Sequence, residues 1–426
     1  MYKYITLDNG IRLGLFEMPE VRSVALKAML PGGPVVEDEL HAGASHFIEH
    51  IVLDGTKSYH SKYDFAKNLE ELGISYNGYT ATQEISFEFD VPYTNIEKAI
   101  DILEEVLFYP LFSNEIIEKE REVILSEMQD RENSPDFLFY YISQEKRFKD
   151  KQHPLSQKVI GKEATVRALT KPMLWDLYEK LFCPENILIG LVGNFNADEI
   201  IAYMNARIGT FKRGEKLTEK VFSNADLSSS LIYTEEHAKF TNVYTAITSP
   251  GYPLQMKPNE EQGLHLFSAI LGGARTSRLF QEVREEEGLV YDISTSSTNA
   301  KGVGEFMISF EADSSKLDRI LTIVYKNIEK ALKEGFTEEE VRHMKQYMVN
   351  RAFTSFSSPW RINNWILDYL FDEEKVLMPE DLISIIQAVT MDDVRQAVQD
   401  NLQLNALNLV MVGKLEGYKP KEILSV

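Results

Sequence analysis

Two histidines and a glutamate stand close together in the segment His46-Phe47-Ile48-Glu49-His50. On a helix, residues four apart share one face, so the imidazoles of His46 and His50 would project in the same direction with Glu49 beside them. Two convergent imidazoles can bind a zinc ion, and a neighbouring carboxylate can take a proton from water held by the metal. The alternative, without a metal site, is a helix with two surface histidines and a solvated glutamate.

The residues around this motif predict a short helix over residues 44–53. Gly43 or Ser45 can begin the helix, and Asp54-Gly55 can end it. Because the helix must pack on a core, we expect its histidines to be only partly exposed. The order H-x-x-E-H is itself a metallopeptidase signature. The apolar residues of the helix are Phe47, Ile48, Ile51 and Val52.

A centre with two histidines needs a third protein ligand if one position is to stay open for water. Residues 114–131 predict a second helix, begun by Ser113 or Asn114. Glu120 and Glu127 fall on its apolar stripe, two turns apart, where an unpaired carboxylate is costly. Either a metal or a basic side chain from a neighbouring element could pair with them. The stripe consists of Ile116, Ile117, Val123, Ile124 and Met128.

The spacing of these residues resembles the pitrilysin, or insulinase, family of zinc peptidases (M16), in particular short two-domain members such as the mitochondrial processing peptidases and bacterial enzymes. In that family 76 residues separate H-x-x-E-H from a glutamate, and the same spacing separates His50 from Glu127 here. The resemblance implies that His46, His50 and Glu127 bind one zinc ion per chain. It also implies that Glu49 is the general base and that Glu120 supports catalysis.

A segment after the motif resembles the family's edge strand, which pairs with the backbone of the substrate. Residues 84–90 alternate apolar and polar side chains, which predicts a half-buried strand next to it. Without the resemblance, Asn77-Gly78 would be interpreted as a hairpin turn. The residues implied to bind the substrate are Asn77, Thr80, Ala81 and Thr82.

The second half of the chain resembles the family's C-terminal signature between Leu271 and Tyr291. Family members use an arginine and a tyrosine seven residues apart to reach the substrate, and Arg284 and Tyr291 have that spacing. An arginine can bind a peptide carbonyl or carboxylate, and a tyrosine hydroxyl can stabilise an oxyanion. Taken alone, Gly272-Gly273 would be only a turn between helices.

A length of 426 residues predicts two domains of about 200 residues each. A weak repeat supports two related halves, because similar apolar runs end at Gly193 and at Gly413, 220 residues apart. The polar segment 209–230 is the expected linker. We predict an α+β fold with two related domains, 1–215 and 216–426, each a mainly antiparallel sheet packed with helices.

The amino-acid composition bears on the partners and the location of the protein. A net charge of −21 argues against nucleic acid as a partner. No apolar run is long enough to span a membrane and no signal peptide is recognisable, so no membrane association is expected. The single cysteine, Cys183, cannot form an internal disulfide, which fits a cytoplasmic location.

These observations predict a zinc-dependent endopeptidase that acts on peptides or unfolded polypeptide segments. The chain carries both the metal motif and the Arg/Tyr pair, so we expect a homodimer that encloses a chamber. The alternative is a catalytically silent binding or scaffold subunit of the same fold.

Overall fold

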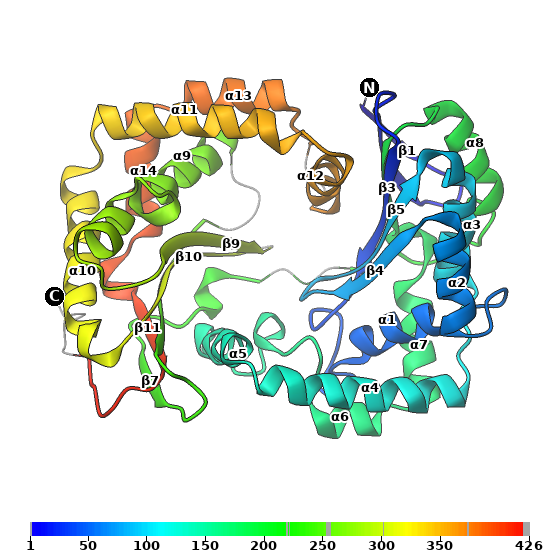
Figure 1. The fold of residues 1–426 in the computed structure, drawn as a ribbon, viewed down its shortest axis with the longest axis horizontal. Helices are drawn as coiled ribbons and strands as arrows, with labels where there is room; N and C mark the ends of the chain where they lie inside the picture. Colours follow the sequence, from blue (N-terminus) through cyan, green and yellow to red (C-terminus); the bar gives the residue numbers. More distant parts are fainter. Residues whose placement is uncertain are drawn as a thin grey trace. The chain divides into compact units, whose positions relative to one another are not determined.

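The computed structural model describes residues 2–218, 220, 222–252, 257–300, 302–372 and 375–420. The chain forms two compact units, each with its own sheet and helices, which confirms the predicted α+β fold (Figure 1). The first unit comprises Met1–Arg131, Gln157–Glu219 and Ser355–Val376, and the second comprises Glu132–Ser156, Lys220–Thr354 and Leu377–Val426.

The sheet of the first unit has the strand order β1-β2-β6-β3-β5-β4. The pair β2–β6 is parallel and the other pairs are antiparallel. Among the residues that the structure describes, β4 lies at an edge of the sheet and pairs with β5 alone. The apolar side of the alternation predicted for β5 is confirmed, because Ile85, Phe87 and Phe89 are fully buried. Ser86, predicted on the polar side, is fully buried as well. The strands are β1 Tyr2–Thr6, β2 Arg12–Glu17, β3 Ser23–Pro31, β4 Ser75–Thr80, β5 Glu84–Pro92 and β6 Leu188–Gly193.

Helices pack against this sheet and share one apolar core with it. The two predicted helices of the motif region are present as α1 and α4, although Val123 is exposed and does not belong to the buried stripe of α4. The helices of this unit are α1 Ala44–Asp54, α2 Lys62–Leu72, α3 Ile96–Phe108, α4 Asn114–Glu132, α6 Glu163–Ala168, α7 Lys171–Leu181, α8 Ala197–Arg207 and α12 Pro359–Phe371.

The second unit has a sheet of order β7-β11-β8-β10-β9, in which only β7–β11 is parallel. Its strands are β7 Ile232–Glu236, β8 Val243–Pro250, β9 Ile293–Ala300, β10 Val303–Ala312 and β11 Asn408–Gly413. Its helices are α5 Pro135–Arg147, α9 Pro258–Ser268, α10 Leu317–Glu334, α11 Glu338–Ser355, α13 Pro379–Ala388 and α14 Met391–Asn401.

The weak sequence repeat corresponds to equivalent strands in the two units. Strands β6 and β11 occupy matching places in their sheets and end at Gly193 and Gly413. Both glycines have positive φ angles, of 149° and 147°. A Cβ atom would lie 2.2 Å from the Ser23 carbonyl oxygen at Gly193 and 2.1 Å from that of Asn242 at Gly413. The two glycines are therefore required for the same close approach to a neighbouring strand.

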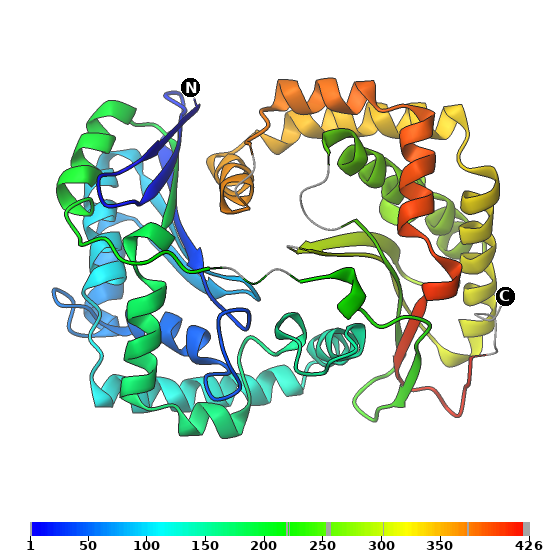
Figure 2. The same ribbon diagram turned by 180° about the vertical axis from the view of Figure 1, so that it is seen from behind.

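Each unit borrows one helix from the other half of the sequence. Helix α12 packs on β2, β3 and β6 of the first unit, and Asn363 donates hydrogen bonds to the carbonyls of Ala25 (2.9 Å) and Gly190 (3.1 Å). Helix α5 packs on β11 of the second unit, and the ring centroid of its Phe139 lies 5.6 Å from that of Tyr244 on the neighbouring strand β8. The predicted domain boundary at 215/216 does not account for this exchange. The irregular segment after α8, which was expected to be the linker, leads into the second unit (Figure 2).

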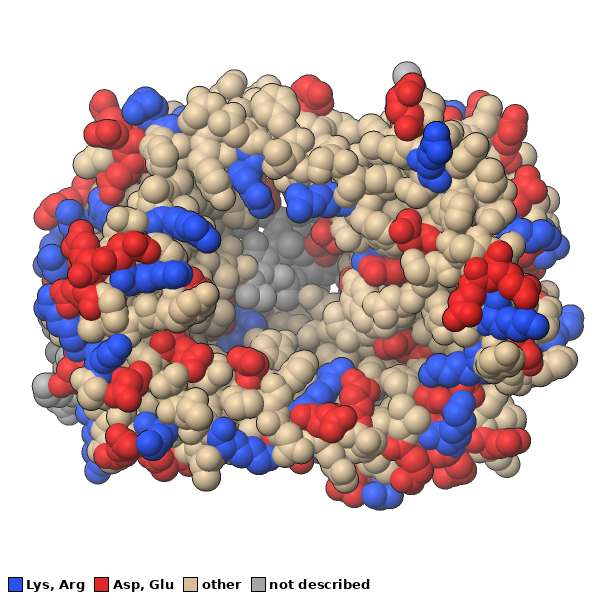
Figure 3. All heavy atoms as spheres, in the orientation of Figure 1, with Lys and Arg blue, Asp and Glu red and all other residues tan. Residues whose placement is uncertain are grey.

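Acidic and basic side chains are interspersed over the visible face (Figure 3). Within the described part of the chain, no helix combines the length and the apolar character that crossing a membrane would need.

Candidate metal centre

The N-terminus of α1 is fixed by a carboxylate that lies outside the helix. Gly43 begins the helix with a φ of 92°, and its N–H donates to Glu37 (2.8 Å). The N–H of Ser45 donates to the other oxygen of the same carboxylate (2.7 Å). Glu37 thus satisfies helix donors that have no partner within α1. This contact orients the first turn, which carries His46.

Helix α4 presents its two glutamates differently. The hydroxyl of Ser113 accepts a hydrogen bond from the N–H of Ile116 (3.1 Å), so Ser113 caps the helix as one of the two predicted residues. The Glu120 side chain is 0% exposed, whereas that of Glu127 is 32% exposed. Only Glu127 therefore combines proximity to the histidines with access to solvent.

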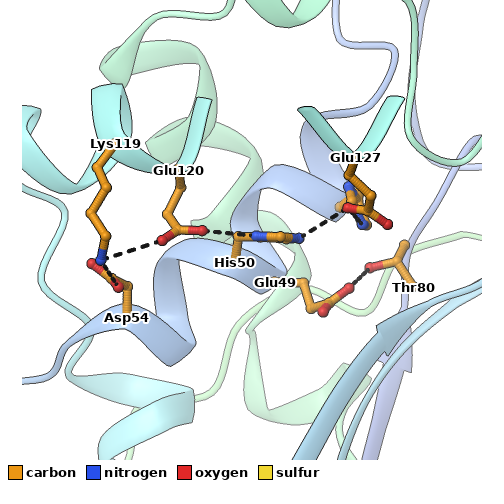
Figure 4. Close-up of polar contacts among 8 residues, drawn as sticks. Glu49, His50, Asp54, Thr80, Lys119, Glu120 and Glu127 are labelled. Carbon is orange, nitrogen blue, oxygen red and sulfur yellow. Dashed lines mark hydrogen bonds and ion pairs between the residues drawn. The ribbon is translucent and has the colours of Figure 1, made fainter. Parts of the chain in front are cut away.

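His46, His50 and Glu127 converge on one point. Figure 4 shows His50 and Glu127 pointing toward each other. Glu127 Oε2 lies 3.6 Å from His46 Nε2 and 3.7 Å from His50 Nε2, too far for hydrogen bonds. Donor atoms that surround a tetrahedral zinc ion at about 2.0–2.2 Å lie roughly 3.4 Å from one another. The spacing and the donor set therefore fit a zinc ion with three protein ligands. This is the one such cluster of His, Cys, Asp and Glu among residues the structure describes.

The chemistry of the histidines agrees with this fit. Burial lowers the pKa of His46 well below its ordinary value of 6.5, so the ring is neutral and can offer a lone pair. Its Nδ1 is buried and has no hydrogen-bond partner among the described residues. His50 Nδ1 lies 2.8 Å from Glu120 Oε2, so its N–H donates to that carboxylate and Nε2 faces Glu127. Glu120 thus contacts the ring nitrogen of His50 that points away from Glu127, which is the place of an orienting partner in metal sites.

Further charged groups support these residues. Lys119 Nζ lies 2.5 Å from Asp54 Oδ1 and 3.5 Å from Glu120 Oε1 (Figure 4). Lys119 therefore links Asp54 of α1 to Glu120 of α4, the hydrogen-bond partner of His50. Arg131 donates to Glu127 Oε1 (2.5 Å), which leaves Oε2 toward the histidines. Sequence reasoning missed Asp54 and Arg131 as partners. Arg131 stands four residues after Glu127 on the same helix, which is a signal that could have found it, whereas Asp54 pairs with Lys119 of a different helix.

Glu49 lies beside the cluster and is only 7% exposed. Thr80 on β4 donates a hydrogen bond to Glu49 Oε2 (2.7 Å), so Thr80 contacts the predicted base through its side chain. Burial raises the pKa of Glu49, against the hydrogen bond from Thr80, which lowers it. A carboxylate with a raised pKa is better suited to take up a proton than a solvated one.

The interpretation of Asn77-Gly78 as a hairpin turn is wrong. Both residues lie inside β4, where Asn77 pairs with Glu88 and Gly78 with Phe87 of β5. The chain turns after Thr80 instead, through Ala81 and Thr82, and the N–H of Ala81 donates to the Glu84 carbonyl (2.8 Å). Asn-Gly is therefore compatible with an edge strand when the side chains around it fix the register.

The Arg284/Tyr291 pair lies in the second unit. Arg284 belongs to a π-helical segment, Phe280–Glu286, and Gly272-Gly273 ends another, Ala269–Gly273. The guanidinium carbon of Arg284 lies 4.9 Å from the ring centroids of both Phe280 and Tyr291. Tyr291 is 86% exposed, so its hydroxyl is accessible. The role of this pair toward substrate stays a prediction.

The sequence matches two family models, "Insulinase (Peptidase family M16)" over residues 17–158 and "Peptidase M16 inactive domain" over residues 168–348. An uncharacterized zinc protease of Rickettsia felis is 26% identical over 397 residues, which cover 91% of this chain and 92% of the relative. The uncharacterized zinc protease YmxG of Bacillus subtilis is 24% identical, with coverage of 92% and 94%.

Solved structures show the same fold. A peptidase M16 inactive domain structure from Pseudomonas fluorescens superposes with a TM-score of 0.88 at 19% identity and covers 99% of both chains. A chain in complex III2 of Candida albicans superposes with a TM-score of 0.82 at 16% identity and covers 99% of this chain and 98% of that chain. A fold and a His-His-Glu cluster of this kind define a zinc protease-like protein. The chain belongs to the insulinase family, peptidase family M16.

Proposed function

We propose that this protein is a zinc-dependent endopeptidase that hydrolyses peptides or unfolded polypeptide segments. The observation that carries the proposal is the convergence of His46, His50 and Glu127, with donor atoms 3.6 and 3.7 Å apart, beside the buried carboxylate of Glu49. A zinc ion bound there would act as a Lewis acid on the scissile carbonyl and would lower the pKa of water.

The chain's own residues would supply the other parts of the reaction. Glu49 would accept the proton of the attacking water and pass it to the leaving amine. The free edge of β4 would bind an extended peptide through backbone hydrogen bonds, which recognise strand conformation independently of sequence. Tyr291 would donate a hydrogen bond to the developing oxyanion, and Arg284 would bind the substrate.

The same proposal includes assembly and location. One chain carries both the metal motif and the Arg/Tyr pair, which supports a homodimer enclosing a chamber that admits peptides and excludes folded proteins. The single cysteine supports a reducing compartment, so we place the protein in the cytoplasm. A catalytically silent binding subunit of the same fold is the alternative, and the complete set of ligands and base argues against it.

The test is cleavage of an internally quenched peptide by zinc-loaded protein and by protein stripped with a chelator, with zinc content measured on the same samples. Glu49→Gln is the matched variant, because it removes the base and keeps all three ligands. We expect it to bind zinc as the wild type does and to lose about 10²–10⁴-fold in kcat. Zinc binding without cleavage by the wild type would favour the silent subunit. Near-wild-type cleavage by zinc-loaded Glu49→Gln would refute the assignment of the base.

A further inference from the structure

Two residues of the edge strand β4 face the metal-binding helix α1. Side chains along a strand alternate between the two faces, so Gly78 and Thr80 point the same way. A Cβ atom at Gly78 would lie 2.6 Å from Leu53 Cδ1 and 3.1 Å from Glu49 Oε1. Helix α1 therefore packs directly on the bare backbone of β4 at this position. A side chain at position 78 would clash with Leu53 and would also crowd the carboxylate of Glu49.

The second contact holds the carboxylate itself. The Thr80 hydroxyl donates to Glu49 Oε2 (2.7 Å; Figure 4). The other oxygen, Oε1, lies toward Gly78. A glutamate side chain has several rotatable bonds, and a hydrogen bond to one oxygen selects one orientation among them. The hydroxyl of Thr80 thus holds one oxygen of the Glu49 carboxylate, and the missing side chain at Gly78 leaves room for the other.

We propose that Gly78 and Thr80 are positioning residues for the general base, so that one strand both holds Glu49 in place and offers its free edge to the peptide. The inference rests on the proposed function and deepens it. A base has to be held within about 0.5 Å of its productive position. A peptide that adds to β4 would bind the strand that already fixes the base. The backbone of β4 would therefore set both the position of Glu49 and the register of the bound peptide.

The first test compares Thr80→Val, which keeps the shape and removes the hydroxyl, with Thr80→Ser, which keeps the hydroxyl. A displacement of about 1 Å in a reacting group can cost on the order of 10²-fold. We expect Thr80→Val to lower kcat about 10–100-fold, with KM within about twofold and zinc content unchanged. Thr80→Ser should recover most of that loss. Thr94→Val, the same substitution at an exposed threonine outside β4, is the control and should keep the wild-type kcat.

The second test uses the space at Gly78. Gly78→Ala should lower kcat in the same way, because the new methyl group displaces Glu49 and Leu53. Shortening Leu53 in the double variant Gly78→Ala/Leu53→Ala opens room for that methyl group and should restore part of the loss. A Gly78→Ala variant with the kcat of the wild type would overturn the inference for this residue.

A measurement without turnover completes the test. In metal-free protein, Thr80→Val should lower the urea midpoint of unfolding, and this shift should disappear in a Glu49→Met background, because the acceptor is then absent. Equal shifts in both backgrounds, or a zinc-loaded Thr80→Val with unchanged kcat, would overturn the inference. A wild type without zinc-dependent cleavage would refute the proposed function, whereas the unfolding result would still decide whether Thr80 holds Glu49.

Discussion

Replacing Glu120 by Gln should weaken zinc binding about tenfold without abolishing it. Glu120 contacts no metal position directly but accepts the Nδ1–H of His50 at 2.8 Å from a fully buried side chain. Gln keeps the size of the side chain and an acceptor oxygen, and removes the charge. The variant therefore isolates the charge of the orienting carboxylate from its shape.

The expected magnitude follows from the kind of hydrogen bond. A hydrogen bond to a charged group contributes about 1.5–3 kcal/mol, and a neutral one about 0.5–1.5 kcal/mol. The difference of about 1–1.5 kcal/mol corresponds to roughly 5- to 13-fold in affinity, since about 1.4 kcal/mol is tenfold. Loss of an orienting partner typically costs about 10–100-fold in metal affinity, which agrees with this estimate.

The assay is competition for zinc against a chromogenic chelator, with all variants measured at the same pH. Glu127→Ala, which removes a ligand, should lose far more affinity than Glu120→Gln. Glu122→Gln on the same helix is the matched control, because the Glu122 side chain is 73% exposed and should not affect the site. Wild-type affinity in Glu120→Gln, or an affinity as low as that of Glu127→Ala, would refute the assignment of Glu120 as an orienting residue.

Three further predictions concern stability and assembly. Gly190→Ala should lower the free energy of unfolding by about 1–3 kcal/mol in urea titrations, because its Cβ would lie 1.9 Å from Asn363 Oδ1; an unchanged midpoint would contradict the packing of α12. Desolvation lowers the pKa of His265 below 6.5, so the unfolded chain binds that proton more readily, and the wild type should lose stability relative to His265→Gln as the pH falls from 7 to 5. Parallel pH dependence of the two proteins would show that His265 is not desolvated. Sedimentation velocity at assay concentration should show a dimer, and a fully active monomer would rule out the dimer as a requirement.

The metal centre could be predicted from the sequence because its residues are tied to local helix geometry. The five-residue motif places His46 and His50 on one face of any helix, and the long spacing to Glu127 matches a known family. Helix α4 and the alternation in β5 were likewise predicted from periodicity. Near neighbours in sequence are enough to predict the two histidines, α4 and β5, whereas the assignment of Glu127 depends on the family spacing.

Other features depend on contacts between distant segments, and sequence reasoning could not reach them. The hydrogen bond from Thr80 to Glu49 and the exposure of Val123 both depend on how elements pack. The turn propensity of Asn77-Gly78 is overridden by pairing with β5. A pattern of residue types carries no signal for such tertiary contacts.

The exchange of α5 and α12 bears on how such a chain could have arisen. The two helices follow Ser134-Pro135 and Ser358-Pro359, at corresponding places in the two halves, and each covers the sheet of the other half. Two separate copies of one half would form this arrangement only if each copy packed its helix on the sheet of the other, as in a domain-swapped dimer. A tandem duplication that joined such copies end to end would turn an exchange between molecules into one within a molecule. The smallest piece that could be inherited as a folded structure would then be a pair of halves that exchange helices. A cut at residue 215 would divide the sequence in two, but each piece would lack a helix of its own folded unit.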